Sequence, residues 1–247
     1  MPSFLRRIEI MVHRANSAIV IKTALEDDYH HFRVAITIND NTISAIETAA
    51  LRTPYSLCAQ AGPELEALHG LAIDEVLHTL PQRVDARLQC THQLDMAGLA
   101  VAAMANGADQ RRYDITVPRH VKGGTTARLW RNGEEILCWQ IENNFIVAPP
   151  KFAGVSLQRG MAAWARTTLD TDMAEAALVL RRGAVISLGR LRNLDLEQHA
   201  KPLGYCYVQQ TERASQAHRM VGSTLDFSDN PASLCADDQD WLKTPTM

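Results

Sequence analysis

The segment Cys90-Thr91-His92-Gln93-Leu94-Asp95 holds residue types that readily transfer protons. If Thr91 is the N-cap of a helix, the helix dipole favours a thiolate at Cys90 and disfavours protonation of His92. A neutral imidazole can accept a proton, and Asp95, three residues further along the helix, can orient its ring. We therefore predict that His92 is a general base positioned by Asp95. The alternative is a helix running on from Pro81, with Cys90 and His92 in the core.

A second group, Pro54-Tyr55-Ser56-Leu57-Cys58, falls between an expected strand and an expected helix. Loops held by rigid elements often carry catalytic groups, and a tyrosine hydroxyl can exchange a proton with a phenolic oxygen. We therefore predict a catalytic role for Tyr55. The alternative is that Tyr55 and Cys58 fill the core.

Metal binding is a further hypothesis, because Cys58, Cys90 and His92 would supply three ligands and leave one position open if the fold brought them together. The order strand, cysteine, helix, later cysteine and histidine is similar to that of iron–sulfur scaffold proteins. The scaffolds' earlier cysteine has no counterpart before residue 50. This hypothesis describes a metal or cluster carrier rather than an enzyme.

The stretch from Gly204 to Ser223 is rich in aromatic and polar side chains. If residues 205–209 form a strand, Tyr205 and Tyr207 lie on one face and can flank an aromatic ring, with Gln209 beside them. Arg213 and Arg219 can hold an anion or a phenolate. These residues are candidates for substrate binding, with Tyr205 a second candidate acid, whereas the alternative gives the arginines a purely structural role.

Composition narrows the classes of function. The 247 residues are 46% hydrophobic and 21% charged, as in ordinary folded proteins, and the net charge of −3 gives no reason to expect nucleic acid or anionic membranes as partners. No P-loop, GxGxxG, GxSxG or HExxH motif occurs, so we expect no cofactor. Five widely spaced cysteines and no apolar run of ~18 residues suggest a cytoplasmic protein with reduced thiols. The expected partner is a small molecule, and the sequence is compatible with a homo-oligomer.

The elements that must position these residues follow an α+β pattern, in which strands precede helices twice. The expected strands are Ile8–His13, Ala18–Leu25, His31–Ile38 and Thr42–Ala49, followed by helices over 57–71, 76–80 and 88–104. Strands Tyr113–Val117, Thr125–Trp130, Glu135–Ile141 and Phe145–Ala148 then precede helices Leu157–Ala165 and Met173–Leu180, the latter opening with Asp172 and Glu175 as a capping box. A strand Tyr205–Gln209, a helix Glu212–Met220 and a wrapping tail complete the pattern.

The repeated order suggests three regions, 1–108, 109–203 and 204–247, within one compact unit. Asn39-Asp40-Asn41, Asn132-Gly133 and Asn143-Asn144 are hairpin turns, because these residues tolerate positive φ. One interpretation is an internal duplication around a central cleft, the natural place for a ligand. Chance recurrence of hairpin, proline and helix is the other.

Several stretches together carry a resemblance to a known family. They are Arg6-Arg7-Ile8-Glu9, Pro54-Tyr55 with Cys58, Cys90-Thr91-His92 with Leu94-Asp95, Phe152-Ala153-Gly154, Ala174–Arg182, and Gly204 through Asp226-Phe227. In these stretches the chain resembles the bacterial family called domain of unknown function 2889.

The resemblance implies a role in the breakdown of aromatic compounds, in which a cofactor-independent lyase releases formaldehyde from the hydroxymethyl side chain of a phenolic lignin-derived dimer. Such a lyase needs a cation for the phenolate, an acid for the benzylic oxygen and a base for the hydroxyl proton. Arg213 or Arg219, Tyr55 or Tyr205, and His92 are the respective candidates. A module that binds aromatic ligands without turnover is the non-enzymatic alternative.

Overall fold

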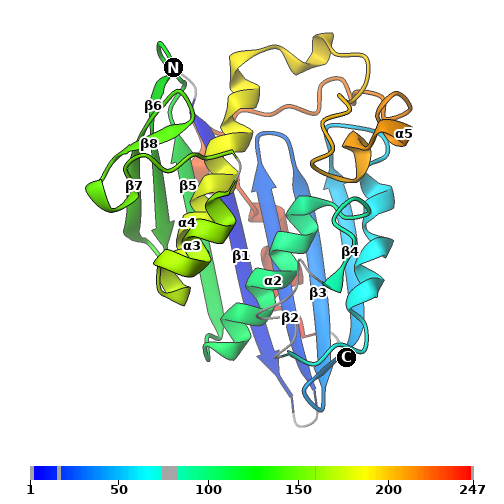
Figure 1. Ribbon diagram of the computed structural model, residues 1–247. Helices are drawn as coiled ribbons and strands as arrows, with labels where there is room; N and C mark the ends of the chain where they lie inside the picture. The colour runs from blue at the N-terminus through cyan, green and yellow to red at the C-terminus, as the bar shows by residue number, and fades with distance from the viewer. Residues whose placement is uncertain (1–2, 16–17, 74–82, 159, 246–247) are drawn as a thin grey trace. The chain divides into compact units, whose positions relative to one another are not determined.

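The computed structural model describes residues 3–15, 18–73, 83–158 and 160–245. Its strands are β1 (Phe4–Arg14), β2 (Ile19–Asp27), β3 (His31–Asn39), β4 (Thr42–Arg52), β5 (Gln110–Val117), β6 (Gly124–Arg131), β7 (Glu134–Glu142) and β8 (Phe145–Ala148). They form one eight-stranded sheet in the order β4-β3-β2-β1-β5-β6-β7-β8. Every neighbouring pair whose register is described is antiparallel. With its helices, this sheet confirms the predicted α+β class (Figure 1).

The two predicted meanders are confirmed, because β1 to β4 and β5 to β8 are each neighbours in chain order. The turn residues behave as their types require: φ is positive at Asp40 and Asn41, at Asn132, and at Asn143 and Asn144. These short polar side chains tolerate the left-handed conformation that a tight hairpin needs. Local sequence therefore sets both the strands and their connections.

The chain divides into two compact units. Unit 1 comprises residues 1–7, 112–193 and 226–234, and unit 2 comprises residues 8–111, 194–225 and 235–247. The C-terminal segment 204–247 contributes to both units. All candidate site residues named above belong to unit 2.

In unit 1, α3 (Met161–Thr168) is followed by α4 (Thr171–Ile186). The predicted capping box is wrong in position, because Asp170 is the N-cap and its side chain accepts the N–H of Met173 at 2.8 Å. Asp172 pairs with Arg131 and Glu175 accepts a hydrogen bond from Tyr113. Both acids therefore serve long-range contacts.

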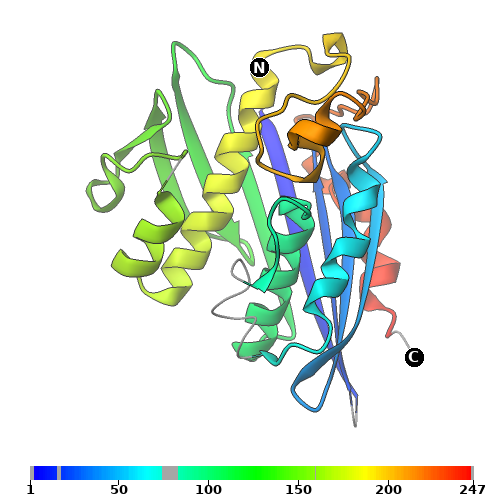
Figure 2. The same ribbon diagram turned by 45° about the vertical axis from the view of Figure 1, so that its right-hand side comes forward.

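Unit 2 places shorter helices after its meander. The predicted helix over 57–71 is two 3-10 helices, η1 (Cys58–Ala61) and η2 (Pro63–Leu68), which lie along β4 (Figure 2). Pro63 lacks the N–H that a continuous α-helix would need. The apolar side chains of Ala61, Leu65 and Leu68 in this stretch are nonetheless buried. The prediction over 76–80 lies outside the described residues.

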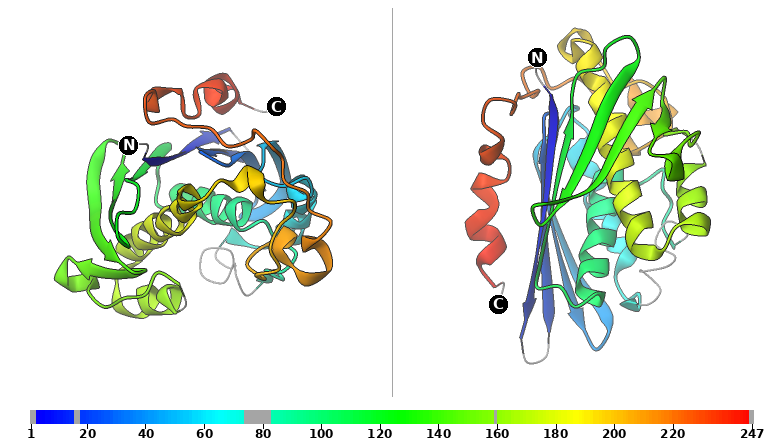
Figure 3. Two further views of the ribbon diagram at one scale, coloured as in Figure 1. Left: turned by 90° about the horizontal axis from the view of Figure 1, so that it is seen from above. Right: turned by 90° about the vertical axis from the view of Figure 1, so that its left-hand side faces the viewer.

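Helix α2 (Thr91–Ala105) packs on β2 and β3. The C-terminal segment of unit 2, with α6 (Gln239–Lys243), covers the opposite face of these strands (Figure 3). Short helical turns make up much of the remainder: η3 (Pro150–Phe152), η4 (Ser187–Leu191), η5 (Leu194–Leu196), η6 (Tyr207–Gln209), α5 (Thr211–Ala214), η7 (Pro231–Ser233) and η8 (Ala236–Asp238). In the described parts of the chain, no helix is long and apolar enough to cross a membrane.

The predicted strand Tyr205–Gln209 and helix Glu212–Met220 are wrong. The 3-10 helix η6 occupies Tyr207–Gln209 in place of the predicted strand. The predicted helix is only the short α5, which ends at Ala214. The reason is a long-range pairing: the N–H of Ser56 donates to the carbonyl of His218 at 2.9 Å, and the N–H of Met220 donates to that of Pro54 at 3.0 Å. Backbone groups that a longer helix would use are engaged by this distant loop.

Candidate functional site

His92 is the second residue of α2. The N-cap is Cys90, with φ −73° and ψ 116°, and no side chain caps the helix. This corrects the predicted N-cap, Thr91, by one residue. Residues 84–90 form turns and bends, so the alternative of a helix continuous from Pro81 is wrong. The His92 side chain is therefore presented by the first turn of α2, and it is 6% exposed.

Asp27 organises the turn that joins β2 to β3. Its Oδ1 accepts the backbone N–H groups of Tyr29 at 2.7 Å and of His30 at 2.8 Å. The Nδ1 atom of His30 lies 3.0 Å from Oδ1 and 3.3 Å from Oδ2 of the same carboxylate. An aspartate at the start of a turn bonds the backbone ahead of it in this way. The sequence Asp-Asp-Tyr-His thus places a carboxylate and an imidazole side by side.

Aromatic rings from the turn, from β3 and from α2 meet beside this carboxylate. The rings of His30 and His92 lie 4.0 Å apart between centroids at an angle of 33°. Phe32 stacks against both, at 5.7 Å from His30 and 6.0 Å from His92. All three side chains are buried, and Tyr29 packs edge-on against His30. The two imidazoles therefore share a desolvated, largely aromatic environment.

Among the described residues, Asp27, His30 and His92 have the types and spacing that could hold a metal ion. Each offers one ligand atom, and these atoms all lie within 4.8 Å of one another. The predicted ligand set of Cys58, Cys90 and His92 is not brought together in this way. His92 thus keeps its predicted place among candidate ligands, but with different partners.

The predicted thiolate at Cys90 is wrong. Burial raises the pKa of its thiol to about 12, although backbone N–H groups of Gln93 and His92 pull in the opposite direction. Burial also raises the pKa of Cys58, with smaller contributions from the neighbouring thiols of Cys90 and Cys206. Desolvation therefore outweighs the helix dipole, and both cysteines are core thiols.

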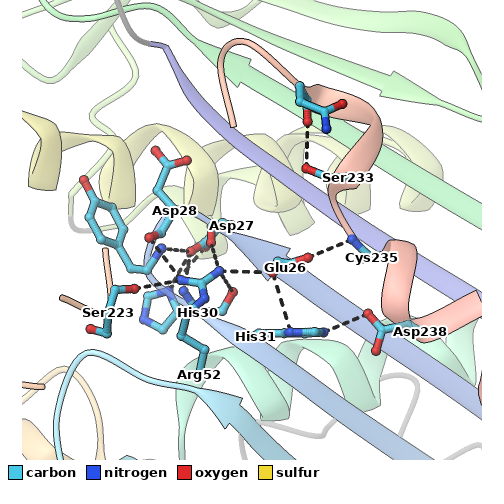
Figure 4. Close-up of polar contacts among 12 residues, drawn as sticks. Glu26, Asp27, Asp28, His30, His31, Arg52, Ser223, Ser233, Cys235 and Asp238 are labelled. Atoms are coloured by element: carbon cyan, nitrogen blue, oxygen red, sulfur yellow. Dashed lines mark hydrogen bonds and ion pairs between the residues drawn. The ribbon is translucent and has the colours of Figure 1, made fainter. Parts of the chain in front are cut away.

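Arg52, at the end of β4, clamps the turn that carries Asp27 and His30. One terminal nitrogen donates to the carbonyls of Asp28 at 3.1 Å and Ser223 at 3.0 Å. The other donates to the carbonyl of Asp27 at 2.6 Å and to the carboxylate of Glu26 at 3.2 Å (Figure 4). A planar guanidinium can serve several acceptors at once, so it holds the turn rigid.

The opposite face of the hairpin carries a second histidine. His31 Nε2 lies 2.8 Å from Asp238, and Glu26 accepts the N–H of Cys235 at 2.8 Å (Figure 4). Asp238 also accepts a bond from Arg33 at 2.6 Å. Burial works to raise the pKa of Asp238, but its hydrogen bonds to His31 and Arg33 outweigh burial and hold the pKa below its ordinary value. This network anchors the C-terminal segment.

Two of the predicted residues meet in the loop after β4. Tyr55 donates to the carboxylate of Glu197 at 3.0 Å, and a backbone bridge pairs it with Arg219. The guanidinium of Arg219 is buried and bonds Asp195 at 2.8–3.0 Å and the carbonyl of Pro54 at 2.8 Å. These bonds give Arg219 the structural role that was the alternative to substrate binding.

The remaining predicted residues lie around η6 and α5. Arg213 stacks over the ring of Tyr207 at 4.1 Å and donates to the carbonyl of Tyr207 at 2.8 Å. Gln209 accepts the N–H of Gly204 through its carbonyl. Tyr205 is 63% exposed, and the predicted strand that would have aligned it with Tyr207 does not form.

Backbone contacts bring this region to the start of α2. The N–H of Tyr207 donates to the carbonyl of Gln89 at 2.9 Å, and Arg213 donates to the carbonyl of Arg87 at 2.9 Å. Cys58 and Cys90 are close enough for their thiols to interact electrostatically. Residues from three separate predicted groups therefore surround the turn that leads into His92.

Sequence reasoning missed Asp27, His30 and the clamp Arg52. The available signal was Asp27-Asp28-Tyr29-His30-His31, an acidic turn followed by two histidines between two apolar strands. Its partner His92 lies on a helix about 60 residues later, so the pattern alone does not reveal their contact. Asp95 lies on α2, three residues after His92, and is half-buried. It places Asp27 in the immediate surroundings of His92.

Comparison with known protein families gives a match over part of the chain. A family model described as protein of unknown function (DUF2889) matches residues 7–106. That stretch holds most of β1, the whole of β2, β3, β4 and α2, and all three residues of the Asp27, His30 and His92 cluster. No match was found among curated proteins. The predicted resemblance is confirmed over this stretch, which is similar to the family of proteins of unknown function DUF2889.

Proposed function

We propose that the protein is a carbon–carbon lyase, which releases formaldehyde from the hydroxymethyl side chain of a phenolic, lignin-derived aromatic dimer without a cofactor. His92 is the proposed general base. The substrate class follows from the family resemblance, and the choice of base follows from its surroundings. The proposed enzyme acts in the catabolism of aromatic compounds in the cytoplasm.

The observation that carries the proposal is the buried cluster of Asp27, His30 and His92. A base is useful when its ring is held in one orientation and kept from bulk water. The carboxylate of Asp27 is held by two backbone N–H groups and lies against the ring of His30, which in turn packs on the ring of His92. This arrangement supports a role for Asp27 and His30 in positioning His92, beside the role predicted for Asp95.

The proposed reaction balances without an oxidant or reductant. His92 takes the proton of the side-chain hydroxyl, and the O–H bonding pair becomes the second C–O bond of formaldehyde. The broken carbon–carbon bond supplies the pair for a new carbon–carbon double bond, while the benzylic oxygen departs with its bonding pair and takes a proton from an acid. The base gains one proton and the acid loses one.

Tyr55 and Arg213 are the proposed partners of His92. Tyr55 donates its hydroxyl proton to the carboxylate of Glu197, and this bond holds the hydroxyl that would turn to the benzylic oxygen of a bound substrate. Arg213 presents a guanidinium stacked on an aromatic ring, and such a pair suits a phenolate ring bound alongside. Tyr205 is the alternative acid. Arg219 is the alternative cation, although its bonds to Asp195 and Pro54 already hold the loop.

The test is incubation of the full-length protein with a panel of phenolic dimers that carry a hydroxymethyl side chain. Formaldehyde is captured and quantified, and the aromatic product is identified by mass spectrometry. We expect formaldehyde and the unsaturated aromatic product in a 1:1 ratio. Dimers whose hydroxyl is methylated serve as the control, because they have no proton for the base to remove.

Saturable binding of an unchanged ligand would instead favour the non-enzymatic binding module. If no dimer in a broad panel loses formaldehyde and none binds, the proposed substrate class is wrong.

A further inference from the structure

We propose that Asp27, His30 and His92 bind one divalent transition-metal ion of the Zn²⁺ type, which these residues ligate through one carboxylate and two imidazoles. The inference goes beyond the lyase proposal and does not depend on it. It rests on the ligand types, their separation, their burial and the groups that hold them in place.

The ligand types suit such an ion. Two imidazoles and one carboxylate are a common donor set for Zn²⁺ in sites that keep a further position open, and imidazole also suits the neighbouring divalent metals. All three side chains come from the part of unit 2 that matches the family model. The open positions would take water.

The separations fit a shared ion. Two donor atoms that each lie about 2.0–2.1 Å from one Zn²⁺ are about 3.3–3.4 Å apart at the tetrahedral angle. Asp27 and His30 already approach to 3.0 and 3.3 Å. The atoms of the whole set lie within 4.8 Å of one another, so the imidazole of His92 has to close in by at most about 1.5 Å.

The burial of the site favours a cation. The carboxylate of Asp27 is fully buried, and His30 and His92 are 8% and 6% exposed. A carboxylate removed from water is stabilised by hydrogen bonds, which Asp27 receives from the backbone of Tyr29 and His30, and further by a compensating charge. A divalent ion at this position would neutralise the carboxylate and use the lone pairs of both imidazoles.

The surroundings hold the ligands in advance. Backbone N–H groups of Tyr29 and His30 orient the carboxylate of Asp27. The guanidinium of Arg52 fixes the same turn by donating to the backbone carbonyls of Asp27 and Asp28. Groups that orient metal ligands typically contribute 10–100-fold to affinity. The competing explanation is that His30 is a neutral histidine that only completes the turn, and this explanation predicts no specific metal affinity.

A bound ion and a proton exclude each other at the ring nitrogens. The metal-free protein is therefore the form in which His92 can act as the proposed base. The metal site and the lyase are tested by separate measurements, because metal binding is followed without substrate and formaldehyde release is followed after treatment with a chelator.

The experiment uses full-length protein stripped with a chelator and dialysed into metal-free buffer. Zn²⁺ binding is measured by isothermal titration calorimetry, and Co²⁺ is added separately as a spectroscopic probe of ligand number and type. The variants are His30→Gln and His92→Gln, with His69→Gln as the matched control, because His69 is an exposed histidine in the same unit. Circular dichroism and thermal midpoints confirm that each variant folds.

We expect one Zn²⁺ per chain in the wild type and in His69→Gln, with a visible Co²⁺ spectrum of nitrogen and oxygen ligation. His30→Gln and His92→Gln should each weaken binding by at least about 10²-fold. Failure of the wild type to bind one equivalent, or unchanged affinity in both folded variants, would overturn the proposal. Loss of binding in one of the two folded variants with no loss in the other would also contradict a three-ligand site.

Discussion

At the scale of single residues, the chemistry gathers where two short sequence features meet. The turn after β2 supplies Asp27 and His30, and the first turn of α2 supplies His92. Neither feature is distinctive alone. Their meeting in a buried ring cluster is what makes His92 a candidate base and ligand.

His92→Ala should lower turnover of a formaldehyde-releasing substrate by about 10²–10⁴-fold if His92 is the base. The His92→Gln variant keeps most of the side-chain volume, so it separates lost chemistry from lost packing. Turnover and thermal midpoint are measured on the same preparation. If folded His92→Ala retains wild-type turnover, His92 is a core histidine whose loss costs only stability, about 1–3 kcal/mol.

Cys90 should be inert toward alkylation in the native protein. With a pKa of about 12, its thiol has almost no reactive thiolate at pH 8, and it is buried. Iodoacetamide labelling followed by peptide mass spectrometry should therefore modify Cys138, which is half-buried, well before Cys90. Both should react after denaturation. Native labelling of Cys90 at the rate of a free thiol would contradict the buried, protonated state.

At the scale of elements, the β2–β3 hairpin uses its two faces differently. Asp27 and Phe32 face α2, whereas Glu26 and His31 face the C-terminal segment. Side chains alternate across a strand, so neighbouring residues reach opposite layers. One hairpin end therefore carries both the candidate site and the anchor of the C-terminal segment.

Arg52→Ala should lower the free energy of unfolding by about 2–4 kcal/mol, because several carbonyls of the turn lose a charged donor. Arg52→Lys should recover only part of this lost stability, because a lysine ammonium lacks the planar guanidinium with its several N–H donors. Arg119→Ala is the control, as Arg119 is an exposed arginine. Urea unfolding measures all three. Equal stability of Arg52→Ala and Arg119→Ala would show that the clamp contributes nothing.

At the scale of the whole molecule, the chain passes between its two units five times. The final passage delivers residues 235–247 to unit 2, where Asp238 is tied to His31 and Arg33. Lys22 adds bonds to the carbonyls of Trp241 and Thr244. Contacts this distant in sequence make the stability of unit 2 depend on the end of the chain.

The contribution of Asp238 to stability should be lost in acid. Its folded-state pKa lies below its ordinary value, so the stabilisation is present above the unfolded carboxyl pKa of about 3.9 and disappears as pH falls through the folded value. We expect Asp238→Asn to be less stable than wild type at pH 7 and the gap to narrow at pH 3. The charged or titratable groups of this network besides Asp238 are His31, Arg33 and Glu26. A constant gap, measured by urea unfolding at both pH values, would contradict this account.

Much of the fold was predictable because it depends on local rules. Alternating and β-branched residues mark all eight strands, and Asn132 or Asn143 mark turns by tolerating positive φ. The predictions failed where distant contacts decide the outcome. Pro63 and the packing on the sheet divide one expected helix into two 3-10 helices. Backbone hydrogen bonds from the loop at Pro54 engage residues 218 and 220, where a longer helix was expected.

The candidate site divides in the same way. The sequence alone predicted that His92 lies in the first turn of a helix, with a helix continuous from Pro81 as the alternative, and that it has the chemistry of a base or ligand. Only the tertiary structure decided that its neighbours are Asp27 and His30, and that Cys90 stays protonated. The physical reason is that helix and strand formation depend on residues a few positions apart, whereas desolvation and ligand geometry depend on which surfaces the packed sheet and helix bury together.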